Sequence, residues 1–155
     1  MPTTRIPPSL LEIHEYEGPG FQALVNFPNW RVALLNFTTE LIPERIDEIQ
    51  RHNETDEVFI LLKGRCILFL GEGDDPATSF FAQDLEPFHL YNVRRGAWHT
   101  HALSVDAKVL IVENQNTSPA NSPRVKLTAD QRNQIIGLCH QLWGDEVFDP
   151  IHHLS

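Results

Sequence analysis

The sequence contains little cysteine, and the cysteine it has is not arranged for a structural role. The two cysteines, Cys66 and Cys139, lie far apart and form no CxxC pair. Small disulfide-stabilised domains need several bridges, and zinc knuckles need closely spaced thiols. The sequence therefore excludes a disulfide framework and a cysteine-based zinc site. We expect free, buried thiols in a reducing compartment, which places the protein in the cytoplasm.

Basic residues are also scarce, and long apolar runs are missing. The chain has 12 Lys and Arg against 21 Asp and Glu, a formal net charge of -9. Such a chain cannot neutralise the phosphates of a nucleic acid, so we expect no nucleic-acid partner. No segment approaches the roughly 20 consecutive apolar residues that cross a bilayer, and the N-terminal segment lacks a signal-peptide pattern. We therefore expect no membrane association.

Short apolar segments separated by turn residues are present instead. A chain of 155 residues fits one domain. Runs rich in Val, Ile, Leu and Phe recur between turn signals such as Lys63-Gly64 and the loop Gly71–Ser79, a pattern typical of an all-β sandwich or barrel. We expect strands at Arg31–Phe37, Thr39–Ile49, Glu57–Lys63, Arg65–Leu70, Phe88–Val93, His99–Ser104 and Lys108–Glu113.

One amphipathic helix is predicted near the C-terminus. Thr128, with Gln131 three residues later, forms a capping box, and Gly144 is a stop signal. One face at helical spacing should cover the β-structure, and it carries Ile135, Leu138, Cys139 and Leu142. The predicted organisation is one domain with an N-terminal extension (1–29), a barrel core (30–114), a linker (115–127), the helix (128–144) and a tail (145–155) whose His152 and His153 are not taken as ligands.

The segment RHNETDEVFILLKG, residues 51–64, places polar residues directly before an apolar strand. His52 and Glu57 are five positions apart, so a turn or bulge must separate them if both face one cavity. Alternate strand residues share a face, so Glu57, Phe59 and Leu61 would point into a barrel together. Converging imidazoles and carboxylates are donors that a divalent metal binds. A polar turn leading into a strand is the simpler alternative.

The segment VRRGAWHTH, residues 93–101, has a glycine turn followed by two histidines. His99 and His101 are two residues apart on a predicted strand, so both face the cavity or both face away from it. Trp98 has the opposite parity, and we expect it to point into the core on the other side.

Both segments resemble the two motifs of the cupin superfamily. Glu57 and Gly64 have the six intervening residues of the first motif, and His52 matches its second histidine in the longer spacing variant. Gly96 and His99 match the glycine and the histidine of the second motif. The resemblance covers about residues 30–114.

The chain departs from the family pattern at several positions. Gln50 stands at the first histidine of motif one, and Glu44 at its leading glycine. In motif two, Phe88, Arg94 and Leu103 replace the glycine, the proline and the asparagine. Three of the four ligand positions are therefore filled.

The resemblance implies an all-β, antiparallel double-stranded β-helix, the cupin jelly-roll barrel, usually assembled as a homodimer. It implies a divalent metal, with Fe, Mn, Zn and Ni all open, held inside the barrel by His52, Glu57 and His99. His101 could replace the missing donor or face a substrate. Two histidines and one carboxylate leave positions open for a ligand.

Four further residues are candidates for contact with a small-molecule ligand. Gln50 stands at a ligand position of the family, and Tyr91 could present its hydroxyl to the pocket. Arg94 could hold a carboxylate with two hydrogen bonds, and Glu54 could support the ligands or transfer a proton. For Glu54 and Arg94, a solvated turn is the simpler interpretation.

Two functions remain open at this point. The first is a metal-dependent cupin that binds a small polar metabolite, a sugar or a carboxylate, and acts as a dioxygenase, isomerase, epimerase or lyase. The second is a metal-free cupin that binds a small molecule without turnover, as a binding or sensor module. Gln50 and the missing motif glycines motivate the second.

Overall fold

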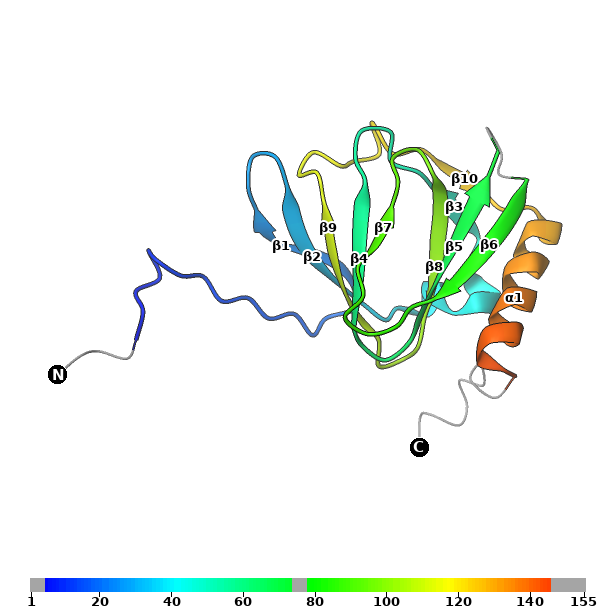
Figure 1. Ribbon diagram of the computed structural model, residues 1–155, viewed down its shortest axis with the longest axis horizontal. Coiled ribbons are helices and arrows are strands. Elements are labelled where there is room, and N and C mark those ends of the chain that lie inside the picture. Colours follow the sequence, from blue (N-terminus) through cyan, green and yellow to red (C-terminus); the bar gives the residue numbers. More distant parts are fainter. Residues whose placement is uncertain (1–4, 74–77, 146–155) are drawn as a thin grey trace.

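The computed structural model describes residues 5–73 and 78–145 and shows a β-barrel with a helix at one side (Figure 1). The strands are β1 (Gly20–Asn26), β2 (Arg31–Asn36), β3 (Glu48–Gln50), β4 (Glu57–Lys63), β5 (Cys66–Glu72), β6 (Ser79–Asp84), β7 (Tyr91–Val93), β8 (Trp98–Leu103), β9 (Lys108–Glu113) and β10 (Arg124–Lys126). Helix α1 spans Ala129–Trp143.

The strands form two five-stranded sheets with antiparallel pairing. Sheet A has the order β1-β2-β9-β4-β7, and sheet B has the order β10-β3-β8-β5-β6. Strands distant in sequence, such as β2 and β9, are neighbours, as the crossing connections of a jelly roll require. The predicted all-β jelly roll with a C-terminal helix is confirmed.

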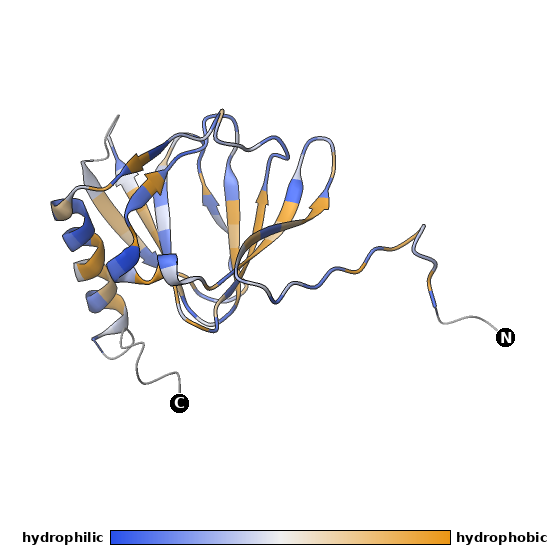
Figure 2. Cartoon of the chain, turned by 180° about the vertical axis from the view of Figure 1, so that it is seen from behind, coloured by the Kyte–Doolittle hydropathy of each residue, from blue (hydrophilic) through white to orange (hydrophobic). Residues whose placement is uncertain are grey.

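The space between the sheets holds the main hydrophobic core. Residues of β4 alternate as predicted: Glu57, Phe59 and Leu61 are buried, while the residues between them are half-buried. In Figure 2 the strands carry most of the hydrophobic colour and the connecting loops are largely hydrophilic. The buried cluster comprises Ala33, Leu35, Phe59, Leu61, Cys66, Leu68, Leu85, Val93, Leu103, Ala107, Val109 and Ile111.

A second core lies between the outer face of sheet B and helix α1. Ile135, Cys139 and Trp143 of the helix pack in one cluster with Ile67 and Trp98 of the sheet. Trp98 is 1% exposed on this outer side, which confirms its predicted orientation away from the cavity.

The helix has the predicted ends, and its buried face differs by one residue from the expected one. Thr128 and Gln131 form both bonds of the capping box, and the Gly144 N–H donates to the His140 carbonyl. Leu142 is 39% exposed, whereas Trp143 is buried. The helix therefore docks through Trp143 where the spacing argument had chosen Leu142.

One predicted strand is wrong, and three strands were not predicted. The expected strand Thr39–Ile49 consists of two 3-10 turns, Thr39–Leu41 and Pro43–Arg45, followed by short β3. Pro43 fixes its backbone and cannot donate to a ladder, which ends any strand at this point. The unpredicted strands are β1, which lies within the segment 1–29, β6, and β10, which lies within the segment 115–127.

The turn between β4 and β5 requires its glycine. Gly64 has φ +72, and a Cβ at this position would lie 2.7 Å from the Ala107 Cα and 2.7 Å from the Ser104 Oγ. Both the left-handed backbone and the close approach exclude a side chain.

The remaining predictions about cysteines, membrane segments and the tail have these outcomes. Cys66 and Cys139 are buried and free, as expected. None of the helices in residues 5–73 and 78–145 combines the length and apolar character needed to cross a bilayer. Residues 74–77 of the predicted loop, and His152 and His153 of the tail, lie outside the described residues.

Candidate metal centre

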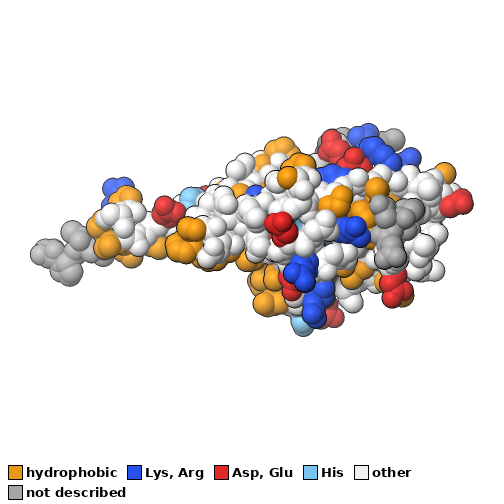
Figure 3. Space-filling model, turned by 90° about the horizontal axis from the view of Figure 1, so that it is seen from above, with side chains coloured by type: hydrophobic (Ala, Val, Ile, Leu, Met, Phe, Trp, Pro, Cys, Tyr) orange, Lys and Arg blue, Asp and Glu red, His pale blue; other side chains and the backbone are white. Residues whose placement is uncertain are grey.

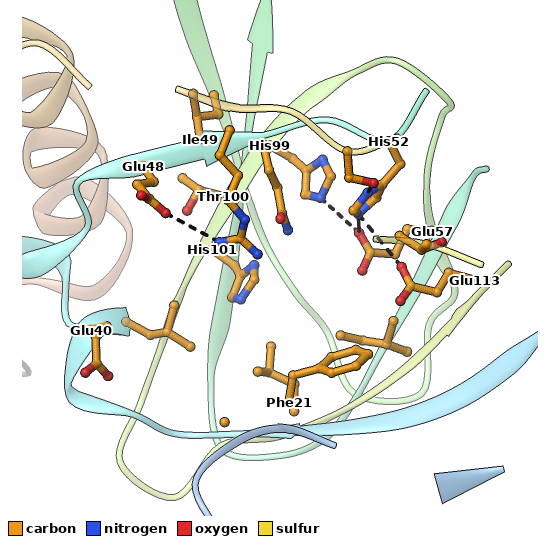
Figure 4. Close-up of a pocket in the computed structure, with 18 of the residues that line it drawn as sticks. Phe21, Glu40, Glu48, Ile49, His52, Glu57, His99, Thr100, His101 and Glu113 are labelled. Carbon is orange, nitrogen blue, oxygen red and sulfur yellow. Dashed lines mark hydrogen bonds and ion pairs between the residues drawn. The ribbon is translucent and has the colours of Figure 1, made fainter. Parts of the chain in front are cut away.

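Three chain segments bring His52, Glu57 and His99 together inside the barrel (Figure 4). His52 follows β3, Glu57 begins β4 in the other sheet, and His99 is the second residue of β8. The register pairs Gln50 of β3 with His99 of β8. The Gly96 N–H donates to the His52 carbonyl at 2.7 Å, which ties the loop carrying His52 to the turn before β8. A turn or bulge was predicted between His52 and Glu57, and the structure has a turn there, which leads from sheet B to sheet A and lets both side chains face one cavity.

The donor atoms of these three residues converge on one point. Glu57 Oε2 lies 3.0 Å from His52 Nε2 and 2.9 Å from His99 Nε2. One ligand atom from each residue lies within 4.8 Å of the others. The exposed fractions are 6% for His52, 4% for Glu57 and 0% for His99, so little of the group is open to solvent.

The outer nitrogen of each imidazole fixes which ring atom carries the proton. His99 Nδ1 lies 3.0 Å from the Ala97 carbonyl oxygen, which can only accept, so Nδ1 is protonated. His52 Nδ1 lies 2.7 Å from Ser122 Oγ. Ser122 donates its own proton to Asn121 Oδ1 at 3.0 Å, so its oxygen accepts from His52. In their neutral forms, both rings therefore direct an Nε2 lone pair toward the Glu57 carboxylate.

Lone pairs that face a carboxylate at about 3 Å repel it unless a positive charge lies between them. Either protons on the Nε2 atoms or a metal cation can supply that charge. His99 Nε2 is buried and makes no aligned hydrogen bond within the described residues, although the Glu57 oxygen is near. A cation coordinated by His99 Nε2 would satisfy this nitrogen. Histidine ligands of metals commonly donate their other ring N–H to a backbone carbonyl, as His99 Nδ1 does to Ala97.

The electrostatics of the group favour a carboxylate that stays ionised. Burial alone would raise the pKa of Glu57, but the two imidazoles together lower it well below its ordinary value. Burial alone would lower the pKa of His99, but the Glu57 carboxylate and the Ala97 carbonyl raise it above its ordinary value. The site thus stabilises positive charge next to Glu57.

Glu113 is a further acid at this site that the sequence analysis did not identify. It ends β9, is 5% exposed, and its Oε2 lies 3.8 Å from His52 Nε2. Its Oε1 accepts from Arg31 Nε at 2.9 Å and from Arg31 Nη2 at 2.5 Å. Burial and the nearby Glu57 charge raise the pKa of Glu113, while Arg31 opposes that rise. Strand parity could have identified Glu113 from the sequence. Every second residue of β9 is buried, so Glu113 shares the buried face with Val109 and Ile111.

His101 faces the same cavity but does not belong to the converging group. The residues whose donor atoms meet are His52, Glu57 and His99 alone among the described residues. Burial lowers the pKa of His101 to about 4, so its ring is neutral. Its Nδ1 is buried without a hydrogen-bond partner in the described chain, and its ring centroid lies 5.8 Å from that of Phe59. His101 therefore lines the cavity beside the three converging residues, with a neutral ring.

A cavity of about 460 Å³ connects these groups. Its polar wall includes Gln50, Thr100, His101 and Arg124, and Figure 4 shows side chains from both sheets directed into it. Arg124 Nη1 lies 3.4 Å from Glu48 Oε2 at this wall. The apolar lining residues are Phe21, Leu35, Leu41, Ile46, Ile49, Ile111 and Pro119.

The other three predicted ligand contacts lie elsewhere. Glu54 and Arg94 line a separate surface hollow, and Glu54 accepts hydrogen bonds from Asn116 and Asn121. The Tyr91 hydroxyl accepts from the Glu86 N–H at 3.0 Å, and its ring packs on the main core. Of the four candidates, the cavity includes Gln50.

Comparison with known proteins gives matches in structure alone. No family model matches the chain, and no curated protein sequence matches it. The protein BH2720 from Bacillus halodurans is 15% identical with a TM-score of 0.50, over 65% of this chain and 74% of that one. A variant of Streptomyces PAC13 solved with uridine is 9% identical with a TM-score of 0.50, over 77% of this chain and 96% of that one.

A cupin-2 domain protein from Shewanella frigidimarina is 18% identical, with a TM-score of 0.44 over 68% of this chain and 86% of that one. Identities at this level concern the fold and leave the chemistry of the site open. With its two facing five-stranded sheets and its jelly-roll strand order, the chain has the cupin jelly-roll fold.

Proposed function

We propose that this protein binds one divalent metal ion through His52, Glu57 and His99 and holds a small polar metabolite in the adjoining cavity. The observation that carries the proposal is the buried convergence of two Nε2 lone pairs on one carboxylate oxygen. Two imidazoles and one carboxylate are a donor set used for Fe, Mn, Zn and Ni, and they leave positions open. When bound, such an ion supplies Lewis-acid polarisation of a ligand oxygen.

The chain's own residues supply the remaining functions of the site. Ser122 and the Ala97 carbonyl hold the two rings in one orientation. Arg31 holds Glu113 beside the ligands, and its charge offsets one of the two carboxylates. The cavity volume suits a ligand of metabolite size, and His101 and Gln50 offer it polar contacts. A sugar or a carboxylic acid fits this description, and the fold does not select a reaction.

A metal-free binding module is the second candidate, and one observation favours it. The raised pKa of His99 and the lowered pKa of Glu57 allow a proton to supply the positive charge that the cluster needs. Gln50 at a family ligand position fits the same interpretation. In this case the cavity would bind a small molecule without a metal.

Metal analysis of protein purified without a histidine tag separates the two candidates. After reconstitution with Fe, Mn, Zn and Ni in turn, we expect a ratio near one ion per chain for at least one metal. The variants Glu57→Gln and His99→Gln should lose that ion, and the matched surface variant His89→Gln should keep it. A ratio near zero for all four metals would leave the metal-free module.

Location and assembly complete the proposal. Two buried free thiols fit a cytoplasmic protein, where disulfides are rare. We also propose a homodimer, as the resemblance to cupins implies.

A further inference from the structure

Two buried acids stand on neighbouring strands inside the barrel. Strands β4 and β9 are antiparallel, with Val58 opposite Val112. Glu57 and Glu113 each stand one residue beyond that pair, on the buried face of their strand. Figure 4 shows both carboxylates directed toward His52, whereas acidic side chains on the face of the molecule in Figure 3 are spread out among Lys and Arg. Like charges on neighbouring strands repel, so the inner pair requires positive charge beside it.

Arg31 supplies part of that charge through one oxygen of Glu113. The register places Arg31 of β2 opposite Glu113, and Arg31 Nε and Nη2 donate to Glu113 Oε1 at 2.9 and 2.5 Å. The other oxygen, Glu113 Oε2, lies 3.8 Å from His52 Nε2. Arg31 therefore holds the carboxylate in an orientation that turns Oε2 toward the imidazole of His52.

The distance from Glu113 Oε2 to His52 Nε2 suits two atoms bound to one ion. Bonds from a metal to nitrogen or oxygen are about 2.0 to 2.2 Å long, so two ligand atoms lie about 3 Å apart when adjacent and about 4 Å apart when opposite. The separation of 3.8 Å falls between these limits. The closer set, within 4.8 Å of one another, is His52, Glu57 and His99. Glu113 therefore approaches the ion from the side of His52, by rotation of its carboxylate about the oxygen that Arg31 holds.

Gln50 is the other residue that could complete the donor set. It stands at a ligand position of the family and lines the same cavity. Its side chain is a neutral amide, whereas sites for Mn, Fe, Zn and Ni are built mainly from imidazole, carboxylate and thiolate groups. A carboxylate also adds negative charge that attracts a cation, and an amide does not.

We propose that Glu113 is a fourth protein ligand of the metal, bound through Oε2, and that it replaces the donor that Gln50 does not supply. This inference rests on the proposed metal site. Two imidazoles with two carboxylates offer more oxygen than three imidazoles with one carboxylate. Carboxylate oxygen suits Mn(II), while imidazole suits Ni(II). Glu113 therefore contributes more to the affinity for Mn(II) than to the affinity for Ni(II).

Calorimetric titration of the metal-free protein with Mn(II), and separately with Ni(II), tests this role of Glu113. We expect Glu113→Gln to weaken Mn(II) binding at least about tenfold, a loss that even a partner outside the donor set can cause, and to weaken Ni(II) binding by a smaller factor. Glu113→Asp keeps the charge but shortens the side chain by one methylene group, so it should show the same loss of Mn(II) affinity. Circular dichroism confirms that each variant is folded. A general loss of stability affects both metals alike, so the unequal effect identifies a ligand.

Two matched variants serve as controls. Gln50→Leu tests the competing donor, and Glu86→Gln removes an exposed acid in the loop between β6 and β7. Both should bind the two metals as the wild-type protein does.

Three results overturn the inference and leave the three-residue site in place, because the wild-type protein still binds its ion. They are wild-type Mn(II) affinity in both Glu113 variants, equal losses for the two metals, and a loss of Mn(II) caused by Gln50→Leu instead. Wild-type protein that binds neither Mn(II) nor Ni(II) overturns this inference together with the metal proposal.

Discussion

Replacing Glu57 with glutamine tests the role of the central carboxylate most directly. Glu57→Gln keeps the side-chain shape but removes the charge that both imidazoles contact through Oε2. Two unit charges about 4 Å apart interact by about 4 kcal/mol at an effective dielectric constant of 20. Losing even about 3 kcal/mol of such attraction to a divalent ion weakens its binding roughly 100-fold.

Thermal unfolding with added metal measures this loss. At a free metal concentration about 100 times the Kd, ligand binding stabilises the wild-type protein by about 2.7 kcal/mol. For a domain of 155 residues this raises Tm by about 5 to 11 °C. At the same metal concentration Glu57→Gln should shift by less than about 2 °C, and His89→Gln should shift like wild type. Equal shifts in wild type and Glu57→Gln would refute the assignment of Glu57 as a ligand.

Three further changes test the scaffold that positions the site, each by chemical denaturation at neutral pH. Gly64→Ala should lower the free energy of unfolding by about 2 kcal/mol, because the left-handed backbone and the 2.7 Å approach to Ala107 both oppose a methyl group; a neutral result would contradict this. Arg31→Met should lower the free energy of unfolding by about 2 to 3 kcal/mol, because it leaves the buried Glu113 charge unpaired. Adding Glu113→Gln to this variant should recover part of the lost free energy. Ile135→Ala should lower the free energy of unfolding by about 2 to 5 kcal/mol, because it opens a cavity under α1. Leu142→Ala, at a residue 39% exposed, should lower it by less than about 1 kcal/mol.

Residue spacing predicted the part of the site that strand geometry controls. His99 and Trp98 had to face opposite sides of β8 because side chains alternate along a strand, and they do. Glu57, Phe59 and Leu61 had to share a face for the same reason. Alternation along a strand does not depend on which strands lie beside it, so it can be predicted from the sequence alone.

The missed features depend on contacts that no local pattern contains. Glu113 was treated as the end of a strand, although its parity already placed it on the buried face. Its charge is acceptable there because Arg31, from β2, lies opposite it in the antiparallel register. That pairing joins residues 82 positions apart, and only the sheet order reveals it.

The errors at strand level have a similar origin. Thr39–Ile49 is rich in Leu and Ile, but these residues do not alternate as they would in a strand, and Pro43 directs the chain into tight turns. Strand β10 has only three residues and pairs with β3, another strand of three residues, so neither carries a recognisable period. Short strands of this kind form because their neighbours position them.

The arrangement around Glu57 also explains why Ser122, far from any motif, matters to the site. A histidine ligand is useful only if its outer nitrogen has a partner that fixes the ring. His99 obtains this partner from its own strand entrance, the Ala97 carbonyl. His52 sits in a loop without such a carbonyl, and it depends on Ser122 from the segment that leads into β10. Because Asn121 takes the hydroxyl proton, Ser122 must accept from His52, so the short strand β10 and its loop set the tautomer on which the donor set depends.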